Sequence, residues 1–361
     1  MVTPPKIAGF SLLALAQLGC APEFSERASE VSAPRVLGVR STPAEVLPGR
    51  NVTYQLLVGG VDGTVISPLA DWSYCTQPKA TNELNDVAPA CFGEGDFVVP
   101  FGSGVSPTGK LPVNACAQFG PDVPQPSSGS GTDSSGNTVT QTQGRPTDAD
   151  STGGYYQPVI LDVRTGGARI STLGETRITC GLAGSTGEQF AEYNQRTKPN
   201  ENPRISSVIV TSLGDAELSS ENAAEPLAVS ATQVLTLRVS WPMCPSAASC
   251  GDEICSPGEA IQDCPEDCTT PVGCTGSEPF AYLDPEDHVL VDRHESMRVS
   301  WFATRGSFYA DHSGRPQSEF TETTSDNTWT APSEPGPVFM WVVLRDDRGG
   351  VDWQSFKVNV Q

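Results

Sequence analysis

Short segments in which apolar residues recur at every second position constrain the fold of this chain most strongly. Between them lie turns rich in glycine and proline, which account for 35 and 31 of the 361 residues. In residues 51–58 the apolar members of one face are Val52, Tyr54, Leu56 and Val58. A period of two indicates a strand with one buried face. Many short strands joined by such turns predict a mainly β fold with two β-sandwich domains.

The first sandwich is predicted to occupy residues 34–203. Its strands are expected at 35–40, 51–58, 71–74, 96–100, 156–163 and 176–180. Residues 121–144 are dense in Pro, Ser, Gly, Thr and Gln. Such a segment buries too little apolar surface to offset its ordering entropy, so we expect a disordered loop inside this domain.

One short helix is expected over 185–196, at the end of the first domain. Ser185 and Glu188 fit a capping box, and Phe190 and Tyr193 give the helix an apolar face. The prolines at positions 199 and 203 then end the helix and mark the domain boundary.

Residues 204–361 are predicted to form the second sandwich. Its strands are expected at 205–211 and 234–241, and a closing hairpin at 338–345 and up to residue 360. The tetrapeptide Arg-Val-Ser-Trp occurs at 238–241 and again at 298–301. Residues 329–360, which begin with Trp-Thr-Ala-Pro, resemble the last strands of bacterial immunoglobulin-like and PKD-type domains. The resemblance implies an immunoglobulin-like sandwich.

The N-terminal residues have the features of an exported protein. Residues 1–19 contain one lysine, a run of about a dozen apolar residues and a small final residue, which describes a secretory signal too short to span a bilayer. Cys20 follows in an arrangement that resembles a bacterial lipobox, although Gln17 stands where the lipobox usually has Leu. The resemblance implies that Cys20 is lipidated and that residues 20–33 form a flexible tether. The alternative is an ordinary signal peptide with an incidental cysteine.

The cysteine count favours disulfides. Without Cys20 ten cysteines are left, an even number that suits an oxidising compartment. They fall into two groups: Cys75, Cys91, Cys116 and Cys180, then Cys244, Cys250, Cys255, Cys264, Cys268 and Cys274. Each group is even, so each domain can close its own bridges, but the sequence leaves the pairing open. Zinc is disfavoured, because the chain has no CxxC pair and only three histidines.

The acidic composition restricts the partners. The net charge is -21. Nucleic acids and anionic membrane surfaces both require a basic protein surface, so this charge argues against both as direct partners. After Cys20 no apolar stretch approaches membrane length, so we expect membrane attachment through the N-terminal lipid alone. Ala21 and Pro22 lack the Asp that retains enterobacterial lipoproteins in the inner membrane, which favours the outer membrane, on its periplasmic or outer side.

Residues 244–274 form a predicted cysteine-rich knob. The segment CGDEICSPGEAIQDCPEDC, residues 250–268, resembles the short Cys-Gly-x-x-x-Cys-x-x-Gly-Glu repeats of surface proteins of myxobacteria. A segment this short cannot form a hydrophobic core, so disulfides must supply the order. The carboxylates crowding it are Asp252, Glu253, Glu259, Asp263, Glu266 and Asp267. They favour either a calcium site, which takes oxygen ligands, or a purely structural knob with solvated acids.

A second calcium candidate consists of Asp148, Asp150 and Thr152, whose alternate oxygen ligands before Gly153 resemble the first half of a calcium loop. Val159 stands where the bidentate Glu of such a loop is expected, so further ligands would have to come from elsewhere in the fold. The alternative is a turn organised by Asp side chains that bond backbone amides. Residues 144–158 also resemble a recurrent segment of predicted surface lipoproteins of myxobacteria, a family without an assigned activity.

No motif indicates catalysis. Ser185 lies in an Ala-Gly-Ser-Thr-Gly segment that mimics the nucleophile elbow of α/β-hydrolases, but the first position is Ala and no alternating strand–helix pattern surrounds it. His288, His294 and His312 lie near acidic residues but lack a metal-binding spacing.

We therefore expect a non-enzymatic binding or adhesion module whose ligand is an envelope protein or a polysaccharide. The alternatives are a structural envelope scaffold without a soluble ligand and, third, a secreted hydrolase. Trp353 lies on the polar face of the last strand and is a candidate exposed ring for stacking on a sugar or anchoring a partner. The sequence leaves the oligomeric state open.

Overall fold

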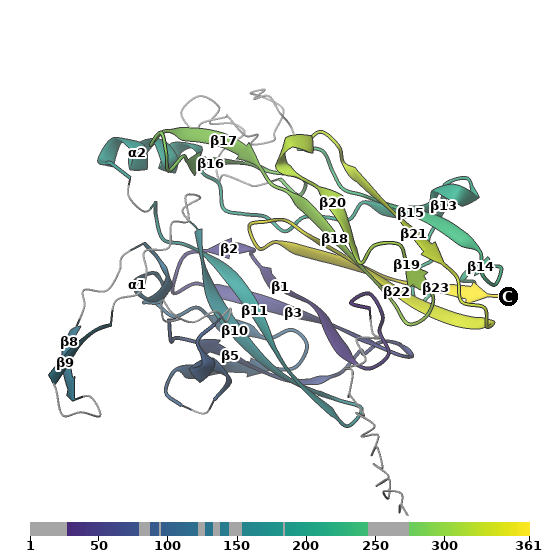
Figure 1. The fold of residues 1–361 in the computed structure, drawn as a ribbon, viewed down its shortest axis with the longest axis horizontal. Coiled ribbons are helices and arrows are strands. Elements are labelled where there is room, and N and C mark those ends of the chain that lie inside the picture. Colours follow the sequence, from purple (N-terminus) through teal and green to yellow (C-terminus); the bar gives the residue numbers. More distant parts are fainter. Residues whose placement is uncertain are drawn as a thin grey trace, which may run out of the picture.

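Two largely antiparallel β-sandwiches lie side by side in the structure, a computed structural model (Figure 1). It describes residues 27–78, 87–93, 95–121, 127–132, 138–143, 154–182, 185–244 and 274–361. The mainly β fold with two β-sandwich domains that the sequence predicts is confirmed.

The first sandwich packs a sheet of order β1-β3-β4, with β7 also paired to β3, against a sheet of order β2-β11-β10-β5-β6. Its strands are β1 (Arg35–Thr42), β2 (Glu45–Val46), β3 (Asn51–Gly60), β4 (Gly63–Thr64), β5 (Leu69–Cys75), β6 (Val98–Ser103), β7 (Thr108–Lys110), β10 (Gly154–Thr165) and β11 (Ala168–Thr179), with the short helices η1 (Pro89–Phe92) and α1 (Ala115–Phe119) in the connections. Alternate side chains of β3, β5 and β10 fill the core, as the period of two requires.

The segment expected to be a disordered loop contains a further hairpin. Strands β8 (Ser127–Thr132) and β9 (Thr138–Gln143) pair antiparallel, with Ser127 opposite Gln143. The prediction of disorder across 121–144 is therefore wrong for these strands. Two strands can satisfy each other's backbone groups without a hydrophobic core, which a composition argument based on apolar burial does not consider.

The second sandwich packs a sheet of order β13-β12-β15-β21-β19 against a sheet of order β14-β23-β22-β18-β20. Its strands are β12 (Ser207–Val210), β13 (Ala216–Glu217), β14 (Leu227–Val229), β15 (Val234–Ser240), β18 (Met297–Ala303), β19 (Ser307–Phe308), β20 (His312–Arg315), β21 (Thr324–Thr330), β22 (Gly336–Arg345) and β23 (Val351–Val360). A separate hairpin of β16 (Pro279–Leu283) and β17 (Leu290–His294) projects from it, and η2 (Thr211–Leu213) and η3 (Gln317–Glu319) are short helical turns.

The repeated Arg-Val-Ser-Trp tetrapeptide occupies corresponding places in the two sheets of this sandwich. One copy ends β15 and the other lies in β18, which belongs to the opposite sheet. Trp241 and Trp301 are both buried in the same core. The repeat therefore places one tryptophan from each layer into a shared interior.

The expected helix is α2 (Gly187–Arg196), but its cap differs from the prediction. Thr186 is the N-cap and forms the capping box with Gln189, one residue after the predicted Ser185–Glu188 pair. The Ser185 hydroxyl instead donates to the Leu182 carbonyl at 2.9 Å. Tyr193 is buried, and it packs with side chains of β16 rather than in the first sandwich.

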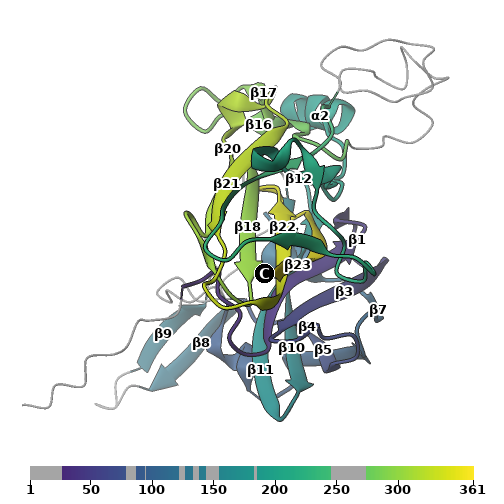
Figure 2. The same cartoon turned by 90° about the vertical axis from the view of Figure 1, so that its right-hand side faces the viewer.

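One face of β22 holds the two sandwiches together. Val338, Met340, Val342 and Leu344 point into the core of the second sandwich. Trp341 and Val343, on the other face, pack against Leu37 and Leu57 of the first sandwich. Figure 2 shows β22 and β23 beside β1 and β3. The apolar pattern on both faces of this strand thus serves two separate cores.

The segment before β1 is bound to the second sandwich, which corrects part of the expected tether. Val31 is fully buried, and its backbone N–H donates to the Ala303 carbonyl at 2.9 Å. The Ala303 N–H in turn donates to the Ser29 carbonyl at 2.9 Å, and Arg27 Nη1 donates to the Phe308 carbonyl at 2.6 Å. The prediction of a flexible tether over 20–33 is therefore wrong from Arg27 onward; Cys20 lies outside the described residues.

Among the described residues there are three disulfides: Cys75–Cys91, Cys116–Cys180 and Cys244–Cys274. Each joins two members of one predicted group, so no bridge among the described residues crosses between the groups. Cys250, Cys255, Cys264 and Cys268 lie outside the described residues, so their bridges stay a prediction. Across the described part of the chain, no helix has the length and apolar character needed to cross a membrane.

Candidate functional site at the junction of the sandwiches

The calcium sites predicted from sequence motifs lie outside the described residues and stay predictions. Asp148, Asp150 and Thr152 lie outside the described residues, as do the six acids of the knob. Within the described ranges, no group of three or more His, Cys, Asp or Glu side chains could hold a metal ion. His294 stacks on Phe320 with ring centres 3.7 Å apart.

Trp353 does not offer the open ring that its position in the strand predicts. It is only partly exposed and packs against the interface between the sandwiches. The Arg40 guanidinium lies 4.6 Å from the ring centre, and Gly38 contacts the ring so closely that a Cβ there would lie 3.1 Å from it. This tryptophan therefore fixes the first sandwich on the second.

A group of buried charged side chains occupies the junction of the two sandwiches. We name it the junction cluster; its members are Glu45, Arg177, Lys198, Glu278, Glu295, Asp346 and Arg348, and each is at most 8% exposed. Buried charges are costly unless they are paired and hydrogen-bonded. Their concentration at one place distinguishes this junction from the rest of the interface.

Arg348 lies at the centre of the junction cluster and contacts both sandwiches. Its Nη1 donates to Glu295 Oε1 at 3.3 Å and to Glu278 Oε2 at 3.5 Å, both in the second sandwich. Its Nη2 donates to Glu45 Oε2 at 3.2 Å in the first sandwich and to the Lys198 carbonyl at 3.1 Å. Burial lowers the pKa of Arg348, but the charges of Glu295 and Glu45 outweigh burial and raise it, so Arg348 stays charged.

Glu45 is the fixed anion of the cluster. The parallel pairing of β2 with β11 places it opposite Arg177, whose Nε donates to Glu45 Oε2 at 3.0 Å. The Thr179 hydroxyl and the Asn200 N–H also donate to this carboxylate, both at 2.9 Å. Burial raises the pKa of Glu45, but Arg177, Arg348 and these hydrogen bonds outweigh it and hold the pKa below its ordinary value.

Glu278 and Glu295 share one edge of the Arg348 guanidinium. Burial raises the pKa of Glu278 to about 8, and Arg348 offsets this only in part. Burial and the charge of Asp346 raise the pKa of Glu295 well above its ordinary value. Glu278 is therefore largely protonated at neutral pH. The two side chains are 0% and 1% exposed, so they act on the structure from within rather than on a solute.

The turn between β22 and β23 delivers Arg348 to the cluster. Asp346 Oδ1 accepts hydrogen bonds from the backbone N–H groups of Arg348, at 2.9 Å, and Gly350, at 2.7 Å. The carboxylate thus closes a tight loop in which Asp346 and Arg348 are buried although they lie in a hairpin turn. A sequence pattern of Asp, Arg and Gly is typical of an exposed turn. Here the first sandwich packs against the turn, so Asp346 and Arg348 are buried.

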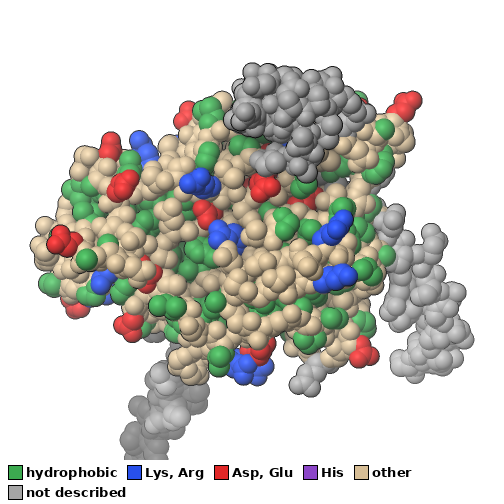
Figure 3. Space-filling view, turned by 180° about the vertical axis from the view of Figure 1, so that it is seen from behind, with side chains coloured by type: hydrophobic (Ala, Val, Ile, Leu, Met, Phe, Trp, Pro, Cys, Tyr) green, Lys and Arg blue, Asp and Glu red, His purple; other side chains and the backbone are tan. Residues whose placement is uncertain are grey.

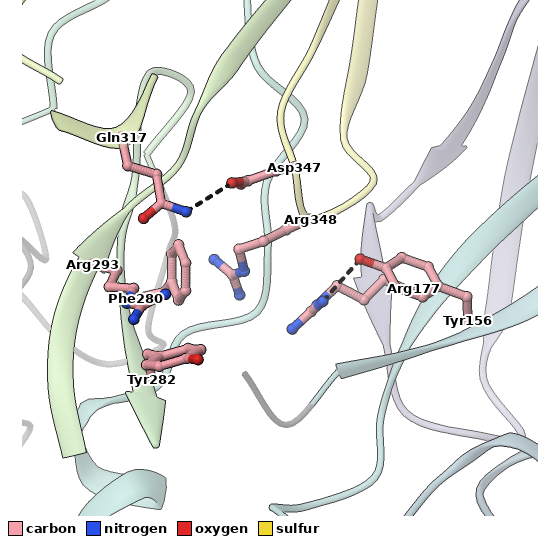
Figure 4. A pocket seen from close by; sticks show the side chains of 8 residues that line it. All are labelled: Tyr156, Arg177, Phe280, Tyr282, Arg293, Gln317, Asp347 and Arg348. Atoms are coloured by element: carbon pink, nitrogen blue, oxygen red, sulfur yellow. Dashed lines mark hydrogen bonds between the residues drawn. The ribbon is translucent and has the colours of Figure 1, made fainter. Parts of the chain in front are cut away.

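A pocket of about 130 Å³ opens beside the cluster, between the sandwiches (Figure 4). Its lining residues are Tyr156, Arg177, Phe280, Tyr282, Arg293, Gln317, Asp347 and Arg348. Tyr156 and Arg177 belong to the first sandwich, and the others to the second. The pocket therefore exists only when the sandwiches are docked. It combines three guanidinium groups and three aromatic rings in a chain with a net charge of -21.

The β16–β17 hairpin presents one wall of this pocket. Its register places Phe280 opposite Arg293, and strand alternation brings Tyr282 to the same face. The Arg293 guanidinium carbon lies 3.4 Å from the centre of the Tyr282 ring, and that of Arg348 lies 5.1 Å from the Phe280 ring. These cation–π contacts orient the guanidinium groups without neutralising them.

A wider, shallow hollow adjoins the pocket and shares Arg293 and Gln317 with it. It has a volume of about 590 Å³, and its other lining residues are Asp292, His294, Pro316, Ser318 and Phe320. The shared residues form the boundary between the two spaces. A ligand in the pocket can therefore continue along the surface of the second sandwich.

Sequence reasoning missed this site because its parts are far apart in the chain. The alternation of Phe280 and Tyr282 was the one local signal, since two aromatic rings share a face of a short strand. Arg348 lies 171 positions after Arg177 (348 − 177 = 171). Only the docking of the sandwiches brings these side chains together.

Comparisons with known proteins give distant structural likenesses. No protein-family model and no curated protein matches the chain. A chimeric titin Z1Z2 carrying an exogenous decorin peptide is 9% identical, and the match covers 92% of this chain and 98% of that one with a TM-score of 0.17. The native conformation of Escherichia coli α2-macroglobulin is 9% identical with a TM-score of 0.21, and this chain spans only 16% of its length. A β-glycosidase from Bacteroides vulgatus is 8% identical with a TM-score of 0.19, and the match covers 90% of this chain and 24% of the glycosidase. Scores this low carry no functional argument.

Proposed function

We propose that this protein is a lipid-anchored, non-enzymatic binding protein of the cell envelope and that the junction pocket contacts its ligand. The observation that carries the binding role is the pocket itself, in which guanidinium groups and aromatic rings of both sandwiches converge. Concave sites that combine aromatic walls with a few oriented polar groups are typical of ligand recognition.

The stable docking of the sandwiches supports this role. Buried apolar side chains of β22, the segment at 27–33 and the junction cluster all join the two halves. A pocket shared by two domains keeps a fixed shape only if the domains do not move apart. On the face shown in Figure 3, acidic and basic side chains are interspersed, so the dense grouping of arginines at the pocket is a local feature.

The anchor rests on the lipobox-like sequence that ends at Cys20. Six residues separate Cys20 from Arg27, where the chain is already bound to the second sandwich. Seven residue steps span at most about 25 Å, so an acylated Cys20 would hold both sandwiches close to the bilayer. Such a placement suits a ligand within the envelope.

The anchor is tested in cells that express the full chain. With labelled palmitate we expect incorporation into the wild type and its loss in Cys20→Ser, which also leaves the membrane fraction. A matched control, Ser25→Ala, keeps the label. Unlabelled wild-type protein in the soluble fraction would contradict the anchor.

The binding role is tested with the soluble chain starting at residue 21. Co-sedimentation with purified envelope polysaccharide and with purified envelope proteins should show saturable binding to one of them. The double variant Tyr282→Ala/Arg293→Ala should lose it, whereas Arg169→Ala, at the exposed β10–β11 turn, should keep it. Release of reducing ends would instead indicate a hydrolase, and absence of any binding would indicate a scaffold.

A further inference from the structure

We infer that the junction pocket recognises a sugar residue that carries a carboxylate, as in a uronic acid of an envelope polysaccharide. The inference rests on the proposed binding function and names the ligand class. It follows from the kinds of side chain that share the pocket, from their remaining hydrogen-bonding capacity and from the size of the space.

Arg293 provides the contact for the carboxylate, and Arg348 adds positive charge to the same pocket. Arg293 forms no salt bridge among the described residues, although its guanidinium is held in place by Tyr282. Arg348 also lines the pocket and adds positive charge there, while its own hydrogen bonds go to Glu295 and Glu45 of the junction cluster. A carboxylate supplies two acceptor oxygens in one plane, which matches the guanidinium geometry.

The other lining residues suit the rest of a sugar. The Phe280, Tyr282 and Tyr156 rings provide apolar faces for the C–H groups of a pyranose. Gln317 offers an amide, and Asp347 an acceptor for hydroxyl groups; Gln317 Nε2 donates to Asp347 Oδ2 at 3.3 Å, which fixes both at the rim. A small apolar anion would leave these polar groups unused.

The charge balance favours a single negative charge over a phosphate. Asp347 lines the pocket and lies at its rim beside Gln317. A dianion placed beside this acid meets more repulsion than a monoanion. A carboxylate therefore fits the local field better than inorganic phosphate or a phosphorylated sugar.

The dimensions favour one sugar residue with continuation into a chain. Drug-sized ligands occupy pockets of about 300–1,000 Å³, so a pocket of about 130 Å³ takes a group no larger than a monosaccharide. The adjoining hollow shares Arg293 and Gln317 and leaves room for the neighbouring residues of a polysaccharide. We expect longer oligomers to bind more tightly than the monosaccharide.

Calorimetric titration of the soluble full chain tests this assignment. The probes are glucuronate and galacturonate as monosaccharides and trisaccharides, the corresponding neutral sugars, and inorganic phosphate. We expect at least one acidic trisaccharide to bind saturably and at least ten-fold more tightly than its neutral counterpart and than phosphate. Arg293→Ala should weaken that binding at least ten-fold, and Arg293→Lys should restore only part of it because Lys lacks the planar fork.

The control variant is Arg169→Ala, which removes an exposed guanidinium far from the pocket lining and should bind like the wild type. Circular dichroism establishes that each variant is folded. Equal binding of neutral and acidic sugars, tighter binding of phosphate, or unchanged binding in Arg293→Ala would overturn the assignment. If envelope polysaccharide sediments with the protein but no uronate binds, the ligand class is wrong and the binding function stands. If neither binds, both proposals fall.

Discussion

Single side chains at the interface show how closely the two sandwiches depend on each other. Thr64 of the first sandwich accepts a hydrogen bond from Trp341 Nε1 at 2.8 Å and donates to Glu221 Oε2 at 2.5 Å. Trp341 is fully buried, so its N–H has no access to water. The Thr64 hydroxyl therefore forms hydrogen bonds with both the indole N–H of Trp341 and the carboxylate of Glu221 in the other sandwich.

Replacement of Thr64 by Val should destabilise the protein by about 2 kcal/mol, because it leaves the buried Trp341 N–H without an acceptor. Urea unfolding followed by tryptophan fluorescence measures the change. Thr321→Val, at an exposed position in the second sandwich, provides the control and should change the unfolding free energy by less than about 0.5 kcal/mol. Equal effects of both variants would refute the role of this hydroxyl.

Glu278 makes the stability of the junction depend on pH. Its pKa is about 8 in the fold and 4.5 ordinarily, so the folded protein binds the proton more tightly. The stability contributed by this group is fully present below about pH 4.5 and is lost as the pH rises through 8. Glu45 has a lowered pKa and acts in the opposite sense, since its contribution is lost on acidification below its ordinary pKa.

We therefore expect Glu278→Gln, which resembles the protonated acid, to flatten the loss of stability between pH 5 and pH 8.5. The wild type should lose a few kcal/mol over this range, at about 1.4 kcal/mol per pKa unit. Thermal unfolding at a series of pH values measures both proteins. Glu322→Gln, at an exposed site, should retain the wild-type slope. An unchanged slope in Glu278→Gln would show that another group controls the dependence.

Among the elements, the segment that precedes β1 joins the sandwiches in an unexpected order. It runs along β18 of the second sandwich before the chain enters the first. Val31 is its apolar anchor, packed with Phe302 and Trp341. Residues 29–31, which precede the first sandwich in the chain, therefore form part of the interface with the second sandwich.

Val31→Asp should release this segment, because an unpaired carboxylate cannot be buried among Phe302 and Trp341 without a large cost. Trypsin should then cleave after Arg27 or Arg35 many times faster than in the wild type, as mass spectrometry of timed digests would record. Val61→Asp, at a position that is 51% exposed, should leave the cleavage rate unchanged. The same rate in all three proteins would mean that the segment is not held by Val31.

The disulfides differ in the length of chain that they close. Cys116–Cys180 joins α1 to the end of β11 across a separation of 64 residues, and Cys75–Cys91 spans only 16. Loop-closure entropy then predicts a loss of about 4 kcal/mol for Cys116→Ala/Cys180→Ala and about 3 kcal/mol for Cys75→Ala/Cys91→Ala. Denaturant unfolding of the two double variants measures the order. The reverse order would show that local packing around Cys75 and Cys91 outweighs chain entropy.

At the scale of the whole molecule, the sandwiches share an apolar interface, a buried charge cluster and a pocket. Separation would expose Trp341 and Val343 and would leave Glu45 and Arg348 without their partners across the junction. Breaking a buried ion pair by removing one partner typically costs 3–5 kcal/mol. Partial unfolding of one sandwich therefore destabilises the other.

We accordingly expect the oxidised chain to unfold in a single calorimetric transition at pH 6, with a calorimetric enthalpy equal to the van't Hoff enthalpy. Arg348→Ala should separate this transition into two, because it removes the centre of the cluster and leaves Glu278 and Glu295 without an ion-pair partner. Arg305→Ala, at a partly exposed site away from the junction, should retain one transition. Two transitions in the wild type would show that the sandwiches fold independently.

Several local features were predictable because they depend on short stretches of chain. The alternation in residues 51–58, the apolar β22 and the position of α2 follow from side-chain periodicity and turn residues. The division of the cysteines into two even groups anticipated that the observed bridges stay within groups. Side-chain periodicity and turn residues depend on neighbours a few positions apart, so a sequence pattern contains the information needed to predict them.

The amino-acid sequence by itself determined the strands, the sandwich class and the restriction of disulfides to each half. The tertiary structure alone decided which charged residues are buried and which side chains line the pocket. Asp346 and Arg348 belong by sequence to an exposed turn, and Trp353 to an exposed strand face, yet the first two are buried in the fold and the third is partly covered. The reason is physical: strand formation depends on neighbours one or two residues away, whereas burial of Arg348 requires Glu45, which lies 303 positions earlier.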